Sequence, residues 1–403
     1  KTFLDNIENF REIRDDKKVR FIGFTPIINE FLLYKMLDFN NEISETQARR
    51  MIWRALVNAG SKGKINNNSF ISAIKEEEEN YLSQTPRRYV IAGSISISQF
   101  SKLPVIRTNN NSVIIFEKIL KKGFRDEVDE LRKNYFFDNK PIFGSYQNIR
   151  IFVDAKTVDD AIDKAIDDFD FVRGVWNLRE NNTHSFRISG GDPKPVNSFV
   201  YGNYFTIHEK SGKLAADSIY TNPNFNQTIT PISLNSKEVD DMQEYLSHIR
   251  KLLRTTKYKE KIVRMITRYA NALDSSNFSI VFLELWSVLE SLTGVDHTNG
   301  SYSTLKRRTA FIFEDTTYNM EVLEQLRQYR NEYVHRNIVS VEIEKFVYIL
   351  KNYVERLLFF HLANGKHFTS LHEAVKLLDS PTNLEEINKK IDILTFAKKF
   401  RGY

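Results

Sequence analysis

The spacing of hydrophobic residues changes along the chain, from short apolar runs in the first half to helical repeats in the second. Residues 89–98 end in strict alternation, and residues 112–116 and 150–154 are two further short apolar runs. Such runs are typical of strands, because alternate side chains point to the same face of a sheet. A helical repeat over residues 158–178 follows the third run directly. This order predicts part of an α/β layer.

The segments on either side of this layer carry more local signals. Residues 44–59 predict a capped amphipathic helix, with Ser44 at the N-cap and Gln47 three residues later. Residues 60–68 have the composition of a loop, and the glutamate run within residues 74–80 predicts a solvated helix face.

A β-hairpin is predicted over residues 199–220, with Gly212 between its two strands. The next stretch, residues 220–236, is rich in Asn, Thr and Pro. Such a composition is typical of the exposed linkers that separate domains. We therefore place a domain boundary there.

Long helical repeats fill the chain from residue 236 onward. The segment Phe278–Leu292 is apolar nearly all round, so we expect it at the centre of a helical bundle, with Glu284 exposed. Apolar residues at steps of three and four also mark a later helix: Val322, Leu323, Leu326, Tyr329, Tyr333 and Val334. We expect these two helices to pack against each other.

The fold class expected from this order is α+β, a mixed α/β domain followed by an all-α bundle. Residues 1–235 form the first domain, which divides further at residue 84 if its two halves are separate subdomains. Residues 236–403 form the bundle. The 403-residue length is sufficient for two or three domains.

Composition restricts the chemistry more than the fold. The chain has no cysteine, which excludes disulfides, thiol catalysis and zinc–thiolate sites and fits a reducing compartment. No signal-peptide pattern is present, and no run approaches the ~20 apolar residues that span a bilayer. We therefore expect a cytoplasmic protein without membrane association. The formal net charge of +6 mildly favours a polyanionic partner.

Basic residues gather in two places. Residues 250–268 hold eight of them against one acidic residue, and steps of four and three join Arg250, Arg254, Lys257, Lys261, Arg264 and Arg268. If one helix continues through Thr255 and Thr256, these residues form a single stripe that can follow RNA phosphates. An ordinary solvated helix face explains the pattern equally well. Lys306, Arg307 and Arg308 form a second basic group and a second candidate RNA contact.

The segment of residues 328–336 (QYRNEYVHR) contains the strongest candidate for a catalytic site. Arg330 lies on the apolar stripe of its helix, and a guanidinium cannot lose its charge when it is buried. It therefore needs an anion or a hydrogen-bonding group. Asn331 and His335 lie four residues apart beside it. Taken alone, this arrangement also fits a helix with one structural arginine and an ordinary surface histidine.

The order of the helical elements resembles that of the HEPN superfamily, most closely its ApeA-like branch. An apolar helix containing LWSVLESL (residues 285–292) is followed by a connector, then by LRQYRNEYVHR (residues 326–336) and a long amphipathic helix (residues 341–357). The resemblance covers about the last 170 residues, a length typical of one domain. It implies a metal-independent endoribonuclease, a hydrolase with an R-x4-6-H motif and no cofactor.

In this resemblance the catalytic residues are Arg330, Asn331 and His335. RNA supplies its own nucleophile, the 2′-hydroxyl, so the protein need not hold a metal. His335 can move a proton near neutral pH, Arg330 can hold the phosphate, and Asn331 can orient either group. The resemblance also favours an acidic residue at Glu290, which would support Arg330. A surface glutamate paired with a nearby cation is the alternative for Glu290.

Residues five apart on a helix point about 140° away from each other, so one motif does not easily surround a phosphate. In the HEPN family two protomers join their motif helices into a composite cleft. A two-fold interface would also explain a charge on the apolar stripe. We therefore expect a homodimer through the helical domain.

The resemblance suggests a toxin or an antiviral effector of abortive infection, which the first domain holds in check until it meets an unknown trigger. That role of residues 1–235 rests on analogy, since they contain no phosphate-binding loop or metal motif and His184 and His208 are isolated. A non-catalytic HEPN scaffold that binds RNA, nucleotide or a partner protein is the second hypothesis. The third is a chance motif, with the function located in the first domain.

Overall fold

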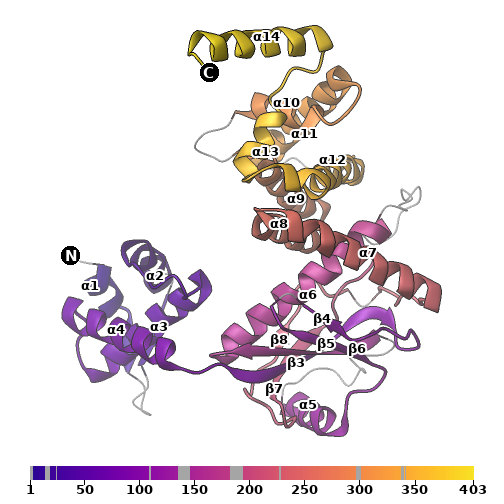
Figure 1. Ribbon diagram of the computed structural model, residues 1–403. Coiled ribbons are helices and arrows are strands. Elements are labelled where there is room, and N and C mark those ends of the chain that lie inside the picture. Colours follow the sequence, from indigo (N-terminus) through magenta and orange to yellow (C-terminus); the bar gives the residue numbers. More distant parts are fainter. Residues whose placement is uncertain are drawn as a thin grey trace. The chain divides into compact units, whose positions relative to one another are not determined.

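The computed structural model describes residues 3–13, 19–23, 25–108, 110–134, 146–181, 194–226, 228–295, 301–336, 340 and 342–403, without the side chains of residues 25, 132, 134, 335 and 336. The fold is α+β, as predicted, with antiparallel pairing in its sheets and a helical C-terminal region (Figure 1). Its two compact units are Lys1–Tyr89 with Val153–Lys164, and Val90–Phe152 with Ala165–Tyr403.

The first unit is mainly helical. Its elements are α1 (Phe3–Glu8), β1 (Arg11–Ile13), β2 (Val19–Phe21), α2 (Thr25–Met36), α3 (Glu45–Lys62) and α4 (Asn67–Ser83). The strands β1 and β2 form an antiparallel pair, and the core lies among the helices, where Ile7, Leu33, Ile52, Leu56 and Phe70 are buried together.

The local predictions for this unit are partly correct. The Ser44 hydroxyl caps α3 by accepting a hydrogen bond from the backbone N–H of Gln47, as expected. A loop was predicted over residues 60–68, and both of its predicted ends are wrong. Helix α3 continues to Lys62, because Gly60 faces the core and is buried, and α4 begins at Asn67 after a capping box at Asn66. The glutamate run lies in α4 and is half-buried to exposed.

A six-stranded sheet follows, in the order β4-β5-β6-β3-β7-β8. This sheet layer belongs mostly to the second unit, although residues 87–89 and 153–164 are part of the first. Its elements are β3 (Arg87–Ser98), β4 (Ile106–Arg107), β5 (Val113–Glu117), α5 (Lys122–Asn134), β6 (Tyr146–Ala155), α6 (Val158–Glu180), β7 (Tyr204–Glu209) and β8 (Tyr220–Thr221). The three predicted strands, the helix after them and the predicted hairpin are all confirmed, although β7 starts later than expected.

Helices cover both faces of this sheet (Figure 1). Phe116 of β5 contacts Phe169 and Trp176 of α6, with ring centroids 6.0 and 5.9 Å apart. On the opposite face, the Arg150 guanidinium lies 4.9 Å from the ring centroid of Phe124 in α5 and bonds to Glu117. Because both faces are covered, the central strand β3 is buried along almost its whole length rather than on alternate residues.

The helical region follows the sheet in the same unit. Its elements are α7 (Ser236–Thr255), α8 (Lys259–Ala272), α9 (Phe278–Leu292), α10 (Tyr302–Ala310), α11 (Thr316–Arg336), α12 (Ile343–Asn364), a 3-10 turn (Gly365–His367), α13 (Leu371–Leu377) and α14 (Leu384–Phe400). Helix α7 begins where the helical domain was predicted to begin. The sheet and these helices nevertheless belong to one compact unit, and the predicted boundaries after residues 84 and 235 stay predictions.

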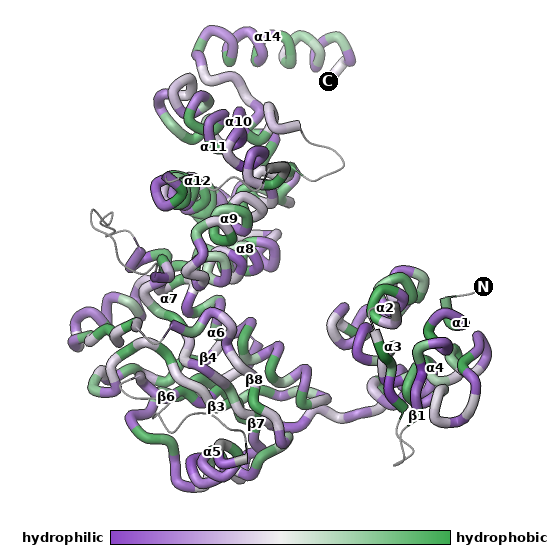
Figure 2. The backbone as a smooth tube through the Cα atoms, turned by 180° about the vertical axis from the view of Figure 1, so that it is seen from behind, coloured by the Kyte–Doolittle hydropathy of each residue, from purple (hydrophilic) through white to green (hydrophobic). Residues whose placement is uncertain are grey.

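Helix α9 is the centre of this region, as expected. It packs against α8 and α12, and hydrophobic residues make up much of α9 and α12 (Figure 2). The predicted contact with the motif helix is also present, because Phe282 of α9 and Tyr329 of α11 meet edge to face with ring centroids 4.9 Å apart. Glu284 is exposed, as predicted. By contrast, α14 buries none of its residues.

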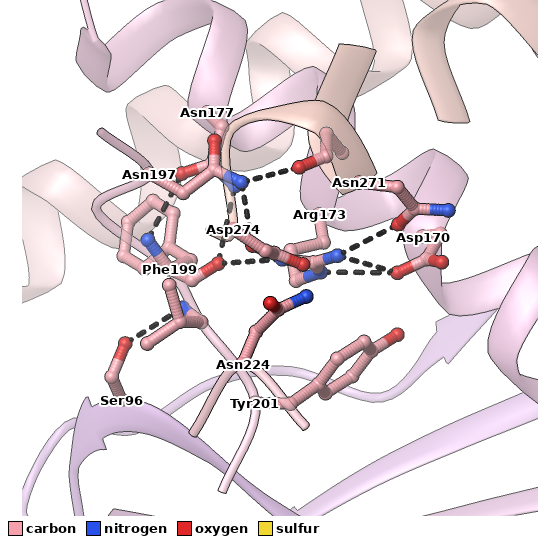
Figure 3. A network of polar contacts seen from close by, with 12 residues as sticks. Ser96, Asp170, Arg173, Asn177, Asn197, Phe199, Tyr201, Asn224, Asn271 and Asp274 are labelled. Carbon is pink, nitrogen blue, oxygen red and sulfur yellow. Dashed lines mark hydrogen bonds and ion pairs between the residues drawn. The ribbon is translucent and has the colours of Figure 1, made fainter. Parts of the chain in front are cut away.

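A fully buried arginine joins the sheet layer to the helices (Figure 3). The Arg173 guanidinium, from α6, pairs with Asp170 at 2.7 Å and with Asp274, in the connection between α8 and α9, at 2.5 Å. It also donates to the Phe199 carbonyl at 3.1 Å and lies 4.3 Å from the ring centroid of Tyr201. These bonds compensate a charge that would otherwise be very costly to bury.

Candidate functional site

The motif helix α11 places Arg330 and Asn331 at the edge of the core, both half-buried. The Arg330 Nη1 atom lies 3.5 Å from the Asn331 Oδ1 atom, a long contact, and its guanidinium lies 5.9 Å from the ring centroid of Tyr302. Its Nε–H is buried and has no hydrogen-bond partner. Among the residues that the structure describes, no carboxylate forms an ion pair with Arg330. Its charge is therefore available to an anion.

An aromatic cluster fixes this helix. Tyr329 is 5% exposed and contacts Phe282 and Phe346, whose ring centroids lie 4.9 and 5.1 Å away. Tyr302 of α10 contacts Trp286 of α9 at 6.4 Å and turns its ring toward the arginines of α11. Because rings of this size are held rigidly by packing, the backbone that carries Arg330 is well positioned. The sequence pattern predicted Tyr329 in the core but gave no reason to single out Tyr302.

Arg327, one turn before Arg330, provides a contrast. Its guanidinium also lies over the Tyr302 ring, at 5.7 Å, but it pairs with Glu324 at 2.5 Å. Glu324 in turn accepts a hydrogen bond from Lys306 at 2.6 Å. Two arginines therefore share one aromatic ring, and only one of them has an acidic partner. The uncompensated one is Arg330.

The hydrogen bonds from Arg327 and Lys306 lower the pKa of Glu324 from 4.5 to about 2. A lowered folded-state pKa stabilises the fold above the unfolded pKa and loses that effect as pH falls toward 2. We therefore expect the stability advantage of the wild type over Glu324→Gln to be full near pH 6 and to shrink between about pH 4.5 and 2. Urea unfolding of both proteins across that range measures it, and a pH-independent difference would show that the carboxylate charge contributes nothing.

His335 lies in the last turn of α11, and its side chain is outside the described residues. Glu290 is placed differently from the expectation. Its Oε1 atom accepts a hydrogen bond from the Trp286 indole at 2.9 Å. Among the described residues no ion pair joins it to Arg330, and a supporting role for Glu290 stays a prediction. This carboxylate therefore has a hydrogen-bond partner, Trp286, within its own helix.

The basic group of Lys306, Arg307 and Arg308 is not free. Arg308 makes a two-point contact with Asp379, at 2.9 and 2.7 Å, and also donates to the Thr293 carbonyl at 2.7 Å. Arg307 reaches the same carboxylate at 2.6 Å but keeps 55% of its side chain exposed. These pairs fasten α10 to the end of α13, so Arg308 is structural. Of the three, Arg307 is the most accessible to RNA, and the predicted RNA contact stays a prediction.

The single basic stripe over residues 250–268 does not form, because the helix that it requires ends at Thr255. The Thr255 and Thr256 hydroxyls both donate to the Leu252 carbonyl, at 2.9 and 3.1 Å, and Thr256 takes an extended backbone. Side-chain bonds of this kind compete with the helical ladder. The chain turns before α8 begins at Lys259. Arg268 lies beyond this break and donates to Ser287 and Ser291 of α9.

The turn sorts the predicted RNA-binding residues into two groups. Arg250, Arg254 and Arg264 line a common cleft, whereas Lys257 and Lys261 are exposed and do not. The opposite wall comes from α6 and the end of β4, far away in sequence. No periodic pattern connects those segments to α7 and α8, and sequence reasoning therefore missed the cleft.

One of the two isolated histidines of the first predicted domain lies within the described residues. His208 is fully buried, with one ring nitrogen 2.8 Å from the Thr206 hydroxyl and the other 2.8 Å from the Gly212 carbonyl. Burial lowers the pKa of His208. It is an ordinary structural residue. His184 lies outside the described residues.

The described segments hold no group of three or more His, Cys, Asp or Glu residues placed to bind a metal ion. None of their helices combines the length and hydrophobicity that crossing a bilayer requires. In comparisons with known proteins, no family model, no curated protein and no solved structure matches this chain.

Proposed function

We propose that this chain is a metal-independent endoribonuclease of the HEPN type, with Arg330, Asn331 and His335 as its catalytic residues. The observation that carries the proposal is the state of Arg330. Its guanidinium is half-buried, beside Asn331 and over an aromatic ring, and no described carboxylate compensates it. A cation in that state is suited to hold a phosphate.

The chemistry follows from these groups and the substrate. His335 removes the proton from the 2′-hydroxyl, whose oxygen bonds to the adjacent phosphorus as the bond to the 5′-oxygen of the next nucleotide breaks. This leaves a 2′,3′-cyclic phosphate, and the departing 5′-oxygen takes a proton from a protonated imidazole or from water to become a 5′-hydroxyl. The same attack on a deoxyribose is impossible, because it has no internal nucleophile. Arg330 offsets the negative charge that develops on the phosphate oxygens. Asn331 lies close enough to Arg330 to orient it or the phosphate.

A homodimer is part of this proposal. Arg330 and His335 diverge on the helix by about 140°, so a second motif helix is needed to enclose a phosphate from both sides. The end of α11 leaves Val334 47% exposed, which supports a partner at this end of the helix. By resemblance, the assembled nuclease is a cytoplasmic toxin or antiviral effector regulated by the remainder of the chain.

The test is incubation of the purified chain with total RNA in EDTA. Light scattering measures the oligomeric state of the same protein. The proposal expects a dimer that degrades RNA and a His335→Ala protein that does not. If the full chain is inactive, residues 236–403 expressed in cells should be toxic and their His335→Ala form harmless. Equal tolerance of both forms would favour a non-catalytic scaffold instead.

A further inference from the structure

A cleft of about 540 Å³ lies between α6 and the corner formed by α7 and α8. Asp168 and Phe171 of α6 form one wall, together with Thr108 and Asn110 beyond β4. The facing wall carries four cations from the end of α7 and the start of α8: Arg250, Arg254, Lys259 and Arg264. The volume of the cleft lies within the range of about 300–1,000 Å³ that is typical of small-molecule sites.

The arginines of this cleft have no acidic partners. Among the residues that the structure describes, no carboxylate forms an ion pair with Arg250, Arg254 or Arg264. The Nε and Nη2 atoms of Arg250 are buried and make no hydrogen bond. Burial, and then the neighbouring charge of Arg254, lower the pKa of Arg250. A buried guanidinium without a counter-charge is costly, and an anion in the cleft would remove that cost.

The acidic side chains of the cleft do not fill this role. Asp168 accepts hydrogen bonds from Thr108 at 3.1 Å, from Asn110 at 2.5 Å and from the Ser112 hydroxyl. Glu260 pairs with its neighbour Lys259 at 3.9 Å, and Asp167 is not free either. The carboxylates thus have partners of their own, whereas the arginines have no acidic partner in the part of the chain that the structure describes.

Other features of the walls indicate the size and nature of the ligand. Apolar side chains lie on both walls of the cleft, Phe171 on α6 and Leu253 and Val263 on the facing wall, and a flat ring can pack against them. The cleft also lies at the N-terminal end of α8, where no side chain caps the backbone N–H groups. Together with the arginines, that end of the helix favours negative charge.

We propose that this cleft binds a nucleoside polyphosphate, with its phosphates against Arg250, Arg254 and Arg264 and its base against the apolar residues of the two walls. A small ligand fits better than an RNA strand. A strand needs a continuous basic path for successive phosphates, whereas the turn after Thr255 leaves Lys257 and Lys261 outside the cleft. The inference concerns binding alone and does not depend on nuclease activity.

The test is calorimetric titration of the full-length chain with ATP, GTP and inorganic pyrophosphate, all in EDTA. Each contact from a charged donor contributes enough that Arg250→Gln or Arg264→Gln should weaken the binding of ATP or GTP by about 10- to 100-fold. Lys261→Gln is the matched control, because Lys261 is exposed on the same helix, three residues before Arg264, but does not line the cleft. It should bind with wild-type affinity.

A second readout separates binding from structure. Because no described carboxylate pairs with Arg250, Arg250→Gln should melt no lower than the wild type in the absence of ligand. If that protein does not fold, the exposed Arg254 and Arg264 provide equivalent variants. A lower melting temperature would instead give Arg250 a structural role.

Three results would overturn the proposal. The first is that none of these probes binds saturably. The second is that Lys261→Gln loses as much affinity as Arg250→Gln or Arg264→Gln. The third is saturable binding of an oligoribonucleotide alone, which would make the cleft an RNA site. That arm uses His335→Ala protein, so that cleavage does not obscure binding. Failure of the nuclease proposal would leave all three titrations interpretable.

Discussion

His335→Ala is expected to slow RNA cleavage by about 10²- to 10⁴-fold, the usual contribution of a general acid–base group. A free imidazole has a pKa near ~6.5, which makes histidine suited to accept the 2′-hydroxyl proton near neutral pH. Initial rates on a labelled RNA measure the effect. His372→Ala is the control, because His372 is an exposed histidine of α13, outside the motif.

Arg330→Ala should reduce the rate by a comparable factor, because it removes the group that stabilises charge on the phosphate. Arg327→Ala is its matched control. Both arginines lie on α11 against the Tyr302 ring, but Arg327 is already neutralised by Glu324. We expect Arg327→Ala to cleave at nearly the wild-type rate. Equal losses in both variants would mean that the two act only by holding α10 and α11 together.

Arg173→Ala is expected to lower the free energy of unfolding by about 3–5 kcal/mol, the range for breaking a buried ion pair. The substitution leaves Asp170, which is 1% exposed, with an uncompensated charge, and it also removes the bond to the Phe199 carbonyl. Because Asp274 belongs to the helical region, the loss should weaken the attachment of that region to the sheet layer.

Urea denaturation followed by circular dichroism measures this loss. Arg125→Ala is the control, because Arg125 on α5 is 48% exposed and a surface change is expected to stay within about ±0.5 kcal/mol. A destabilisation below about 1 kcal/mol for Arg173→Ala would contradict the central role of this network, since even a typical substitution costs that much.

Most helices and strands were predictable, because their hydrophobic residues repeat at the period of the element. Helix α9 has the predicted bounds. Asn277 caps the N-terminus of α9 and Ser44 caps that of α3, as the preference for short polar side chains at this position leads one to expect. Of the candidate site, the position of Arg330 at the edge of the core follows from the same periodicity. Its contact with Tyr302 does not, because that contact joins separate helices.

What the sequence could not predict depends on partners that are distant along the chain. In the sequence, Lys306, Arg307 and Arg308 have no evident acidic partner. In the structure they pair with Glu324 and Asp379. Helix α6 shows the same limit. In its first turns, buried and less buried residues follow the predicted helical repeat. From Asp168 to Leu178 every residue is buried, because the helical region covers the side that would otherwise face solvent.

The most direct test of the proposed function compares two RNA oligonucleotides that differ only at a mapped cleavage position. One carries ribose there and the other carries 2′-deoxyribose, and both are incubated with the wild-type chain in EDTA. The 2′-hydroxyl mechanism predicts cleavage of the first and an intact bond at that position in the second. Cleavage of the deoxyribose bond at a similar rate, or loss of all activity on chelation, would contradict it.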